Sequence, residues 1–160
     1  MMNRNFTNEN LTEASFPNHM MNCVFTDSVI RNVNMTKKEF MNITFSCNID
    51  NTNFSGARLM NIKFGKSFVD NVNFSDANLM NIDFGESEFE NVTFEKTKFR
   101  NAKFELSSFN NVNFCDCEFI NCDLTEVVFI NVNMKNAKFD NCLVSLSVTQ
   151  ATDSPEESTH

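Results

Sequence analysis

The sequence predicts an all-β fold in which one short unit is coiled many times around a common axis. Three observations lead to this prediction. A large apolar residue recurs every five residues over most of the chain, and a smaller inward candidate precedes it by two positions. The chain also contains 19 phenylalanines but no tryptophan or tyrosine. A fixed short repeat period is typical of a solenoid, and one aromatic type used this often indicates one environment repeated many times.

The large residue of each repeat, here called the centre, starts at Phe6 and continues at steps of five, with two steps one residue short. The short steps run from Phe16 to Met20 and from Phe45 to Ile49. Side chains two apart share one face of a strand, whereas a helix would repeat every 3.6 residues. A period of five therefore predicts a very short strand followed by a turn, with every centre pointing to the axis. The central phenylalanines predict a buried ladder: Phe54, Phe64, Phe74, Phe84, Phe94, Phe104 and Phe114.

Several repeats carry a recognisable local motif. They include Ala57-Arg58-Leu59, Ala77-Asn78-Leu79, Val72-Asn73-Phe74 and Ala137-Lys138-Phe139. This pattern resembles the pentapeptide-repeat family, whose loose consensus is Ala-(Asp/Asn)-(Leu/Phe)-X-X, over about residues 6 to 145. The resemblance implies a right-handed quadrilateral parallel β-helix with four repeats per coil. At the usual strand spacing of ~4.8 Å, roughly seven coils would make a rod about 35 Å long.

Asparagine marks alternate corners of the expected coil. The four faces are named A to D after their centres Phe74, Leu79, Phe84 and Phe89. Asparagine follows faces B and D, at Asn61, Asn71, Asn81, Asn91, Asn101, Asn111, Asn121 and Asn131. Asparagine tolerates left-handed backbone, bonds to its own turn, and can hydrogen-bond from layer to layer when stacked. Both short steps fall at the other corners, so we expect the asparagine corners to be less tolerant of changes in length.

The chain is expected to form one domain over residues 1–148, with repeats at about 6–145 and a final strand at about 144–148. Residues 149–160 are polar and acidic, and this composition predicts a disordered tail. The last coil would expose unpaired backbone groups, which are a liability in β-sheets. We therefore expect an end-to-end homodimer through the C-terminal coil.

Composition also bears on the function class. The start of the chain lacks the apolar run of a signal peptide, and no stretch approaches the roughly 18 apolar residues of a membrane span. A cytoplasmic protein without membrane contact is the expectation. We see no nucleophile–base set, phosphate loop or metal-ligand spacing, so no catalytic, cofactor or metal site is expected. Direct nucleic-acid binding is not expected either, for want of a basic patch, and the six cysteines lack a C-x-x-C pair.

One surface feature suggests protein binding. The outward position directly after the face B centre is apolar in five coils: Met21, Met41, Met60, Met80 and Ile120. An exposed apolar stripe often marks an interaction site, and methionine suits adaptable contacts. The other explanation is that coil stacking alone favours these residues or that a terminal segment covers them. The first hypothesis is a non-enzymatic protein–protein interaction scaffold.

A second hypothesis starts from the net charge of -8. One group of pentapeptide-repeat proteins resembles duplex DNA in size and negative surface, binds DNA gyrase or topoisomerase IV, and protects it from quinolones or toxins. The resemblance makes a type II topoisomerase the alternative partner. The residues for such a surface are Asp83, Glu86, Glu88, Glu90, Glu105, Asp123 and Glu126. Lys63, Lys66 and Lys103 interrupt them, which favours the first hypothesis.

Overall fold

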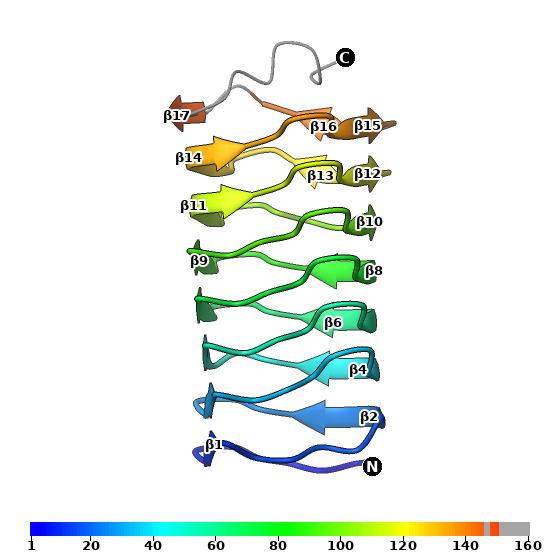
Figure 1. Ribbon diagram of the computed structural model, residues 1–160, viewed down its shortest axis with the longest axis vertical. Helices are drawn as coiled ribbons and strands as arrows, with labels where there is room; N and C mark the ends of the chain where they lie inside the picture. The colour runs from blue at the N-terminus through cyan, green and yellow to red at the C-terminus, as the bar shows by residue number, and fades with distance from the viewer. Residues whose placement is uncertain (146–147, 151–160) are drawn as a thin grey trace.

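The computed structural model describes residues 1–145 and 148–150. The chain forms a right-handed parallel β-helix that rises coil upon coil from the N-terminus at the bottom of Figure 1. The predicted fold class is therefore confirmed. The described residues form strands and turns only, so they contain no helix that could span a membrane.

The largest sheet covers face D, and its last long strands bend round onto face A. Its eight strands, in spatial order, are β1 (Asn10–Thr12), β3 (Val29–Arg31), β5 (Asn48–Asp50), β7 (Phe68–Asp70), β9 (Glu88–Glu90), β11 (Ser108–Asn113), β14 (Val128–Asn133) and β17 (Val148–Gln150). All the neighbouring pairs in this sheet are parallel.

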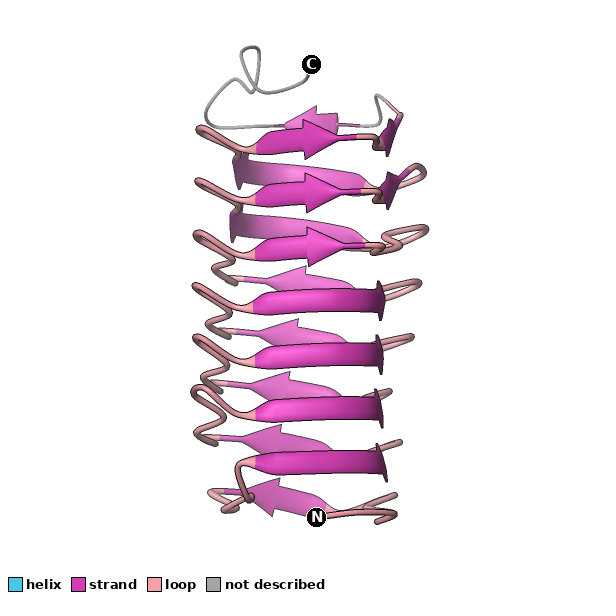
Figure 2. Cartoon of the chain, turned by 90° about the vertical axis from the view of Figure 1, so that its right-hand side faces the viewer, coloured by secondary structure: helices cyan, strands magenta, loops and turns pink. Residues whose placement is uncertain are grey.

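The second sheet covers face B, which faces the viewer in Figure 2. Its seven strands are β2 (His19–Val24), β4 (Glu39–Thr44), β6 (Arg58–Lys63), β8 (Asn78–Asp83), β10 (Lys98–Arg100), β12 (Glu118–Ile120) and β15 (Lys138–Asp140). The six-residue strands continue round the corner onto face C. A third, two-stranded sheet on face C joins β13 (Asp123–Leu124) to β16 (Leu143–Val144).

The register of these strands explains the repeat. Phe99 pairs with Phe119 in the parallel ladder, and Asn81 bonds to Asn61, so each coil spans 20 residues, or four repeats of five. Where a coil contains a short step, the separation falls to 19, as between Asn61 and Asn42. Each outward position therefore forms a column along the rod, with one residue contributed by each coil.

A left-handed residue stands at every full-length corner, and not only at the asparagine corners. The second residue after the centre has positive φ at Asp76 (59°) and Glu86 (58°) as well as at Asn81 (54°). At the two short steps, no residue between Phe16 and Met20 or between Phe45 and Ile49 has positive φ. The short corners thus omit the left-handed residue.

Two phenylalanine stacks form the centre of the core. The seven phenylalanines predicted to form the ladder are each 0% exposed. Those on face A stack on one another, with Phe74 and Phe94 centroids 4.9 Å apart and ring planes 7° apart. They meet the face C stack edge-on, as Phe64 meets Phe74 at 83°. Burial of each ring contributes about 2–3 kcal/mol, so the core is a continuous apolar column.

Small polar side chains inside the coil donate to backbone carbonyls of the previous coil or of their own coil. Thr97 Oγ1 donates to the Phe74 carbonyl oxygen at 2.6 Å, and Cys117 Sγ donates to that of Phe94 at 2.8 Å. Among the described residues, no buried side-chain nitrogen or oxygen lacks a partner. All six cysteines are free thiols. Burial raises the pKa of Cys47 and Cys122 to about 12 and also raises the pKa of Cys117.

The C-terminal end differs from the sequence prediction of one strand over 144–148. Leu143–Val144 pairs with β13 on face C, whereas Val148–Gln150 pairs with β14 on face D. These two strands therefore belong to two different sheets. The predicted disordered tail lies outside the described residues except for positions 149 and 150, which belong to β17. The predicted C-terminal dimer contact lies at this same end.

Candidate functional site

A column of methionines runs along face B. Met21 pairs with Met41, Met41 with Met60, and Met60 with Met80, while Met2 forms a parallel bridge with Met21. We call these five residues the methionine stripe. Sequence reasoning missed Met2, although extending the five-residue step back from Phe6 makes Met1 a centre and Met2 its outward neighbour. Ile120 occupies the same column further along, beyond Arg100.

The methionine stripe is open to solvent. Met2 is 60% exposed and Met60 is 37% exposed, while Met21, Met41 and Met80 are half-buried. The first four coils form a hollow of about 390 Å³ beside the stripe. Six of the nine methionines line it: Met1, Met2, Met20, Met21, Met41 and Met60. Coil stacking does not require methionine here, because Arg100 and Asp140 fill the same column in later coils.

Both borders of the methionine stripe are ordered by side-chain contacts. On one side, Glu39 lies 3.1 Å from His19 Nδ1 through Oε2 and 3.7 Å from Arg58 Nη1 through Oε1. On the other side is the asparagine ladder of the B corner. Beside the stripe, each of these amides donates to the asparagine one coil earlier, from Asn22 to Asn81, as Asn61 does to Asn42 at 2.9 Å. The stripe therefore lies on a backbone that is held at every coil.

A basic patch adjoins the upper part of the methionine stripe. Its five exposed cations lie on β6, on β10 and at the bridge residue that follows on face C: Arg58, Lys63, Lys98, Arg100 and Lys103. Arg100 pairs directly with Met80 in the ladder. Asp83 of β8 lies among them, and Glu39 and Glu118 pair with Arg58 and Lys98 in the ladder. The sequence alone did not single out these cations as a group, because the 20-residue coil brings together residues that are up to 45 positions apart (Arg58 to Lys103).

The residues predicted to form an acidic surface do not lie on one face. Asp83 and Asp123 lie on face C, where each carboxylate accepts a backbone N–H two residues later, from Gly85 at 2.9 Å and Thr125 at 3.0 Å. These two carboxylates alternate with Lys63 and Lys103 along the column. Face C therefore carries alternating charge.

The other predicted acids lie at the C corner and on face D. Glu86 and Glu126 are left-handed corner residues, and Glu105 directly precedes the corner residue of the coil between them. Glu88 and Glu90 are on β9, where Glu90 pairs with Asp70, which in turn pairs with Asp50. Face D is thus the more acidic side of the rod, opposite face B (Figure 1).

One apolar residue at this acidic corner was missed. Leu106 is 59% exposed and has φ of 61°. It occupies the same corner as Glu86 and Glu126, one coil from each. Left-handed backbone is unfavourable for leucine. The five-residue pattern does not predict how exposed the side chain at this position is.

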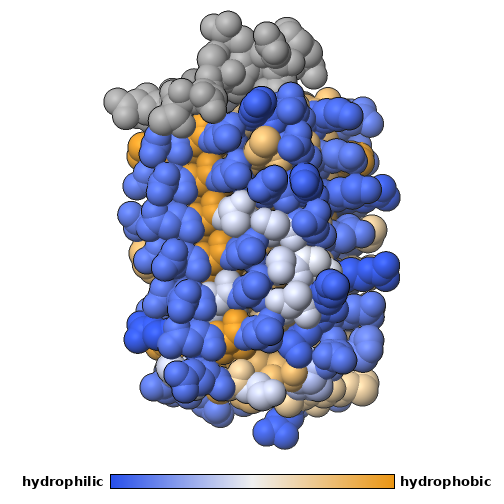
Figure 3. Space-filling model, in the orientation of Figure 1, coloured by the Kyte–Doolittle hydropathy of each residue, from blue (hydrophilic) through white to orange (hydrophobic). Residues whose placement is uncertain are grey.

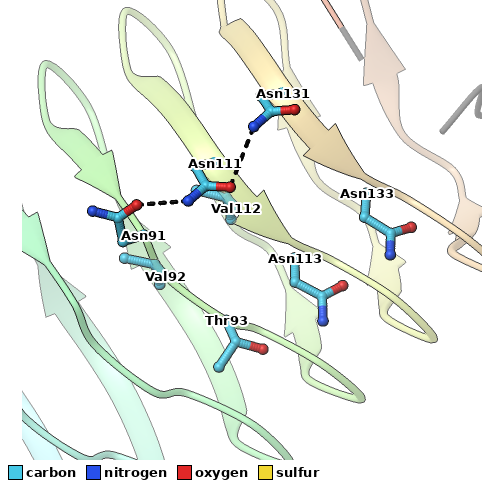
Figure 4. A pocket seen from close by; sticks show the side chains of 8 residues that line it. All are labelled: Asn91, Val92, Thr93, Asn111, Val112, Asn113, Asn131 and Asn133. Atoms are coloured by element: carbon cyan, nitrogen blue, oxygen red, sulfur yellow. Dashed lines mark hydrogen bonds between the residues drawn. The ribbon is translucent and has the colours of Figure 1, made fainter. Parts of the chain in front are cut away.

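A polar groove runs between face A and the D corner, as Figure 4 shows. Asn111 Nδ2 donates to Asn91 Oδ1 at 2.6 Å, and Asn131 donates to Asn111 at 3.3 Å. Asn113 accepts the backbone N–H of Cys115 and so shapes its corner. Val92 and Val112 line the floor of this groove and are buried (Figure 4). A narrow apolar line also runs along the near face of the rod in Figure 3. These side-chain amides stabilise the stacking of the coils and the conformation of the corners.

The asparagine ladders are not continuous in every coil. Asn91 Nδ2 donates to Asp70 Oδ1 at 3.0 Å, which links the D corner to the acidic column of face D. On the B corner, Asn101 donates to Asn81, and Asn141 donates to Asn121.

Within the part of the chain that the structure describes, no three His, Cys, Asp or Glu side chains gather to hold a metal.

Comparison with known sequences identifies one family. A model described as "Pentapeptide repeat region" matches residues 38–114, and a model described as "Pentapeptide repeats (8 copies)" matches residues 107–145. Together they cover residues 38–145. No protein with a curated description matches the sequence.

Solved structures with the same type of repeat are similar at low identity. Rfr23, a pentapeptide repeat protein from the cyanobacterium Cyanothece, is 14% identical with a TM-score of 0.39, covering 80% of this chain and 92% of its own. A trypsin-treated form of QnrB1, a plasmid-mediated fluoroquinolone resistance protein, is 18% identical with a TM-score of 0.36, covering 92% and 72%. HetL from the cyanobacterium Nostoc is 12% identical with a TM-score of 0.33, covering 100% and 91%. At these sequence identities and TM-scores, no function is transferred from these proteins to this chain.

Proposed function

This chain belongs to the pentapeptide-repeat family, and on that basis we propose that it is a non-enzymatic rod that binds another protein along face B. The observation that carries the proposal is the methionine stripe. It is open to solvent, it repeats over five coils, and the fold accepts Arg100 or Asp140 in the same column. Flexible methionine side chains can repack around a partner's apolar residues.

The basic patch specifies the chemistry of the partner. Arg58, Lys98 and Arg100 lie within one or two positions of Met60 and Met80 along the sheet. Apolar anchors surrounded by charge are the usual anatomy of an interface, and complementary charge directs the encounter. We therefore assign the partner to one class: an acidic protein segment with exposed apolar side chains.

The test uses the partner as a purified protein and measures its affinity by calorimetry. Met60→Lys with Met80→Lys should weaken binding at least tenfold, and Arg58→Glu with Arg100→Glu should do the same. The matched control is Val128→Lys, which changes a 38% exposed apolar residue on face D. Equal loss of affinity in the Val128→Lys control would exclude face B as the specific binding surface.

A second candidate function is supported by the acids of face D. Asp50, Asp70 and Glu90 follow one another in one ladder column, with Glu88 beside them, and such a line of charge could imitate a DNA backbone. In this alternative the rod binds a type II topoisomerase and protects it from quinolones. Alternating charge on face C and the basic patch on face B count against a uniformly negative rod. A gyrase supercoiling assay decides it: neither inhibition nor protection at micromolar protein rules out this alternative.

A further inference from the structure

The methionine stripe has a property that apolar docking does not require, namely its sulfur. Other exposed apolar positions of the rod are filled by leucine, valine or phenylalanine, as at Leu106, Val128 and Phe68. Methionine alone fills this column from Met2 to Met80, over five successive coils. Six methionines line one hollow together with His19, and five of them lie outside the core, because Met20 is only 3% exposed.

The geometry of the sheet allows neighbouring thioethers to meet at one point. Met21, Met41 and Met60 are register partners on adjacent parallel strands, so their side chains leave the same face. Adjacent strands lie about 4.8 Å apart. A methionine side chain has three rotatable bonds, and sulfur atoms from such neighbours can turn towards a shared ligand. The asparagine ladder holds the backbone beside them in place.

The imidazole at the edge of the hollow is oriented in a way that suits a metal ligand. His19 Nδ1 lies 3.1 Å from Glu39 Oε2, and Arg58 holds the other Glu39 oxygen at 3.7 Å. This contact leaves Nε2 of His19 available. Metal-binding histidines commonly use their second nitrogen to bond to a carboxylate, which fixes the orientation of the ring.

The donor set selects the kind of ion. Thioethers are soft ligands and select Cu(I), whereas magnesium and calcium require oxygen donors. Zinc sites use Cys, His and carboxylate groups, and no three of these gather in the described residues. We propose that this hollow binds one soft monovalent metal ion, Cu(I), through Met21, Met41, Met60 and His19. This inference goes beyond the proposed function and is independent of it.

The experiment titrates Ag(I), a redox-inert substitute for Cu(I), into protein labelled with ¹³C at the methionine methyl groups. All samples carry Cys115→Ala and Cys142→Ala, which remove the two thiols that are only half-buried. The test variant is Met21→Leu/Met41→Leu/Met60→Leu, because leucine keeps the apolar surface but lacks sulfur. The control is Met35→Leu/Met134→Leu, which changes two buried methionines on face A that are 0% and 7% exposed.

We expect the Met21, Met41 and Met60 resonances to shift with one equivalent of Ag(I), while Met35 and Met134 stay in place. Native mass spectrometry should count one ion fewer on the test variant than on the parent or the control. Glu39→Gln should weaken binding about tenfold, as loss of an orienting carboxylate does. Equal ion counts and affinities for the parent and the test variant would overturn the proposal, and so would unshifted stripe resonances.

The two proposals for face B fail separately. The triple leucine variant keeps an apolar stripe and should still bind an acidic protein partner, but it should not bind Ag(I). Met60→Lys with Met80→Lys should lose the protein partner whether or not the ion binds. A leucine variant that keeps the protein partner and also keeps full Ag(I) binding contradicts the metal assignment while leaving the docking surface in place.

Discussion

The side-chain amide of Asn81 donates a hydrogen bond to Oδ1 of Asn61, one coil earlier, at 2.9 Å. The same amide accepts a bond from Asn101 at 3.0 Å, and its own backbone has φ of 54°. One residue type thus meets two demands of the corner. It adopts left-handed backbone at low cost, and it links three coils through a surface amide.

The two roles of Asn81 can be separated by substitution. Asn81→Ala should cost about 2–3 kcal/mol, because alanine resists left-handed backbone and the two amide bonds are lost. Asn81→Gly should cost only about 1 kcal/mol, since glycine accepts positive φ. Urea denaturation followed by circular dichroism measures both. Equal costs for the two variants would show that backbone conformation is not what asparagine provides at this corner.

The phenylalanine core gives the largest expected effect. Phe94 is 0% exposed and stacks on Phe74 and Phe114. Phe94→Ala should reduce the free energy of unfolding by about 3–5 kcal/mol, because it leaves a cavity between two rings. Phe68→Ala, at a ring that is 38% exposed on face D, should cost less than about 1 kcal/mol. Similar denaturation midpoints for both variants would contradict the stacked core.

Leu106 offers a stabilising substitution. Its φ of 61° is unfavourable for leucine, and its side chain is 59% exposed, so little burial would be lost. Leu106→Asn should therefore raise stability by about 1 kcal/mol, measured as a higher melting temperature. Leu106→Ala keeps the backbone penalty and should give no such gain. If Leu106→Asn melts at or below the parent temperature, the leucine contributes packing that its exposure does not indicate.

The buried thiols predict a loss of stability at alkaline pH. Burial raises the pKa of Cys47 and Cys122 from 9.0 to about 12. Because the folded pKa is the higher one, the unfolded chain loses these protons first. The contribution is complete below pH 9 and is lost as the pH rises towards 12. Cys47→Ala/Cys122→Ala should show a shallower decline in unfolding free energy between pH 9 and pH 11, whereas curves parallel to the parent would contradict this.

Much of the fold could be predicted from the period alone. The five-residue step placed Phe74, Leu79 and Phe84 in the core, and the 19-residue pairs lie where the step is short. The left-handed residues after faces A and C could not be predicted, because Asp76, Glu86 and Lys96 share no side-chain chemistry. Only the backbone geometry of the corner makes these residues alike.

The candidate site was predicted in part. The regular spacing predicted the column of Met21, Met41, Met60 and Met80, but not its exposure, which depends on the neighbouring columns. The basic patch escaped notice because Arg58 and Lys98 are far apart in sequence and lie in one column only in the folded rod, with Asn78 between them. The predicted acidic surface was divided by the same geometry, since Asp83 lies on face C whereas Glu86 is the corner residue that follows this face.

The 20-residue register also determines how such a gene can change in length. Removing or duplicating one whole coil, such as residues 81–100, returns every later residue to the column it occupied before. A cut of five residues would instead turn everything beyond it by a quarter of a coil and carry the later cations of the patch onto a neighbouring face. In-frame duplication of sixty base pairs is thus a conservative mutation for this protein, and selection can lengthen a binding surface without redesigning it.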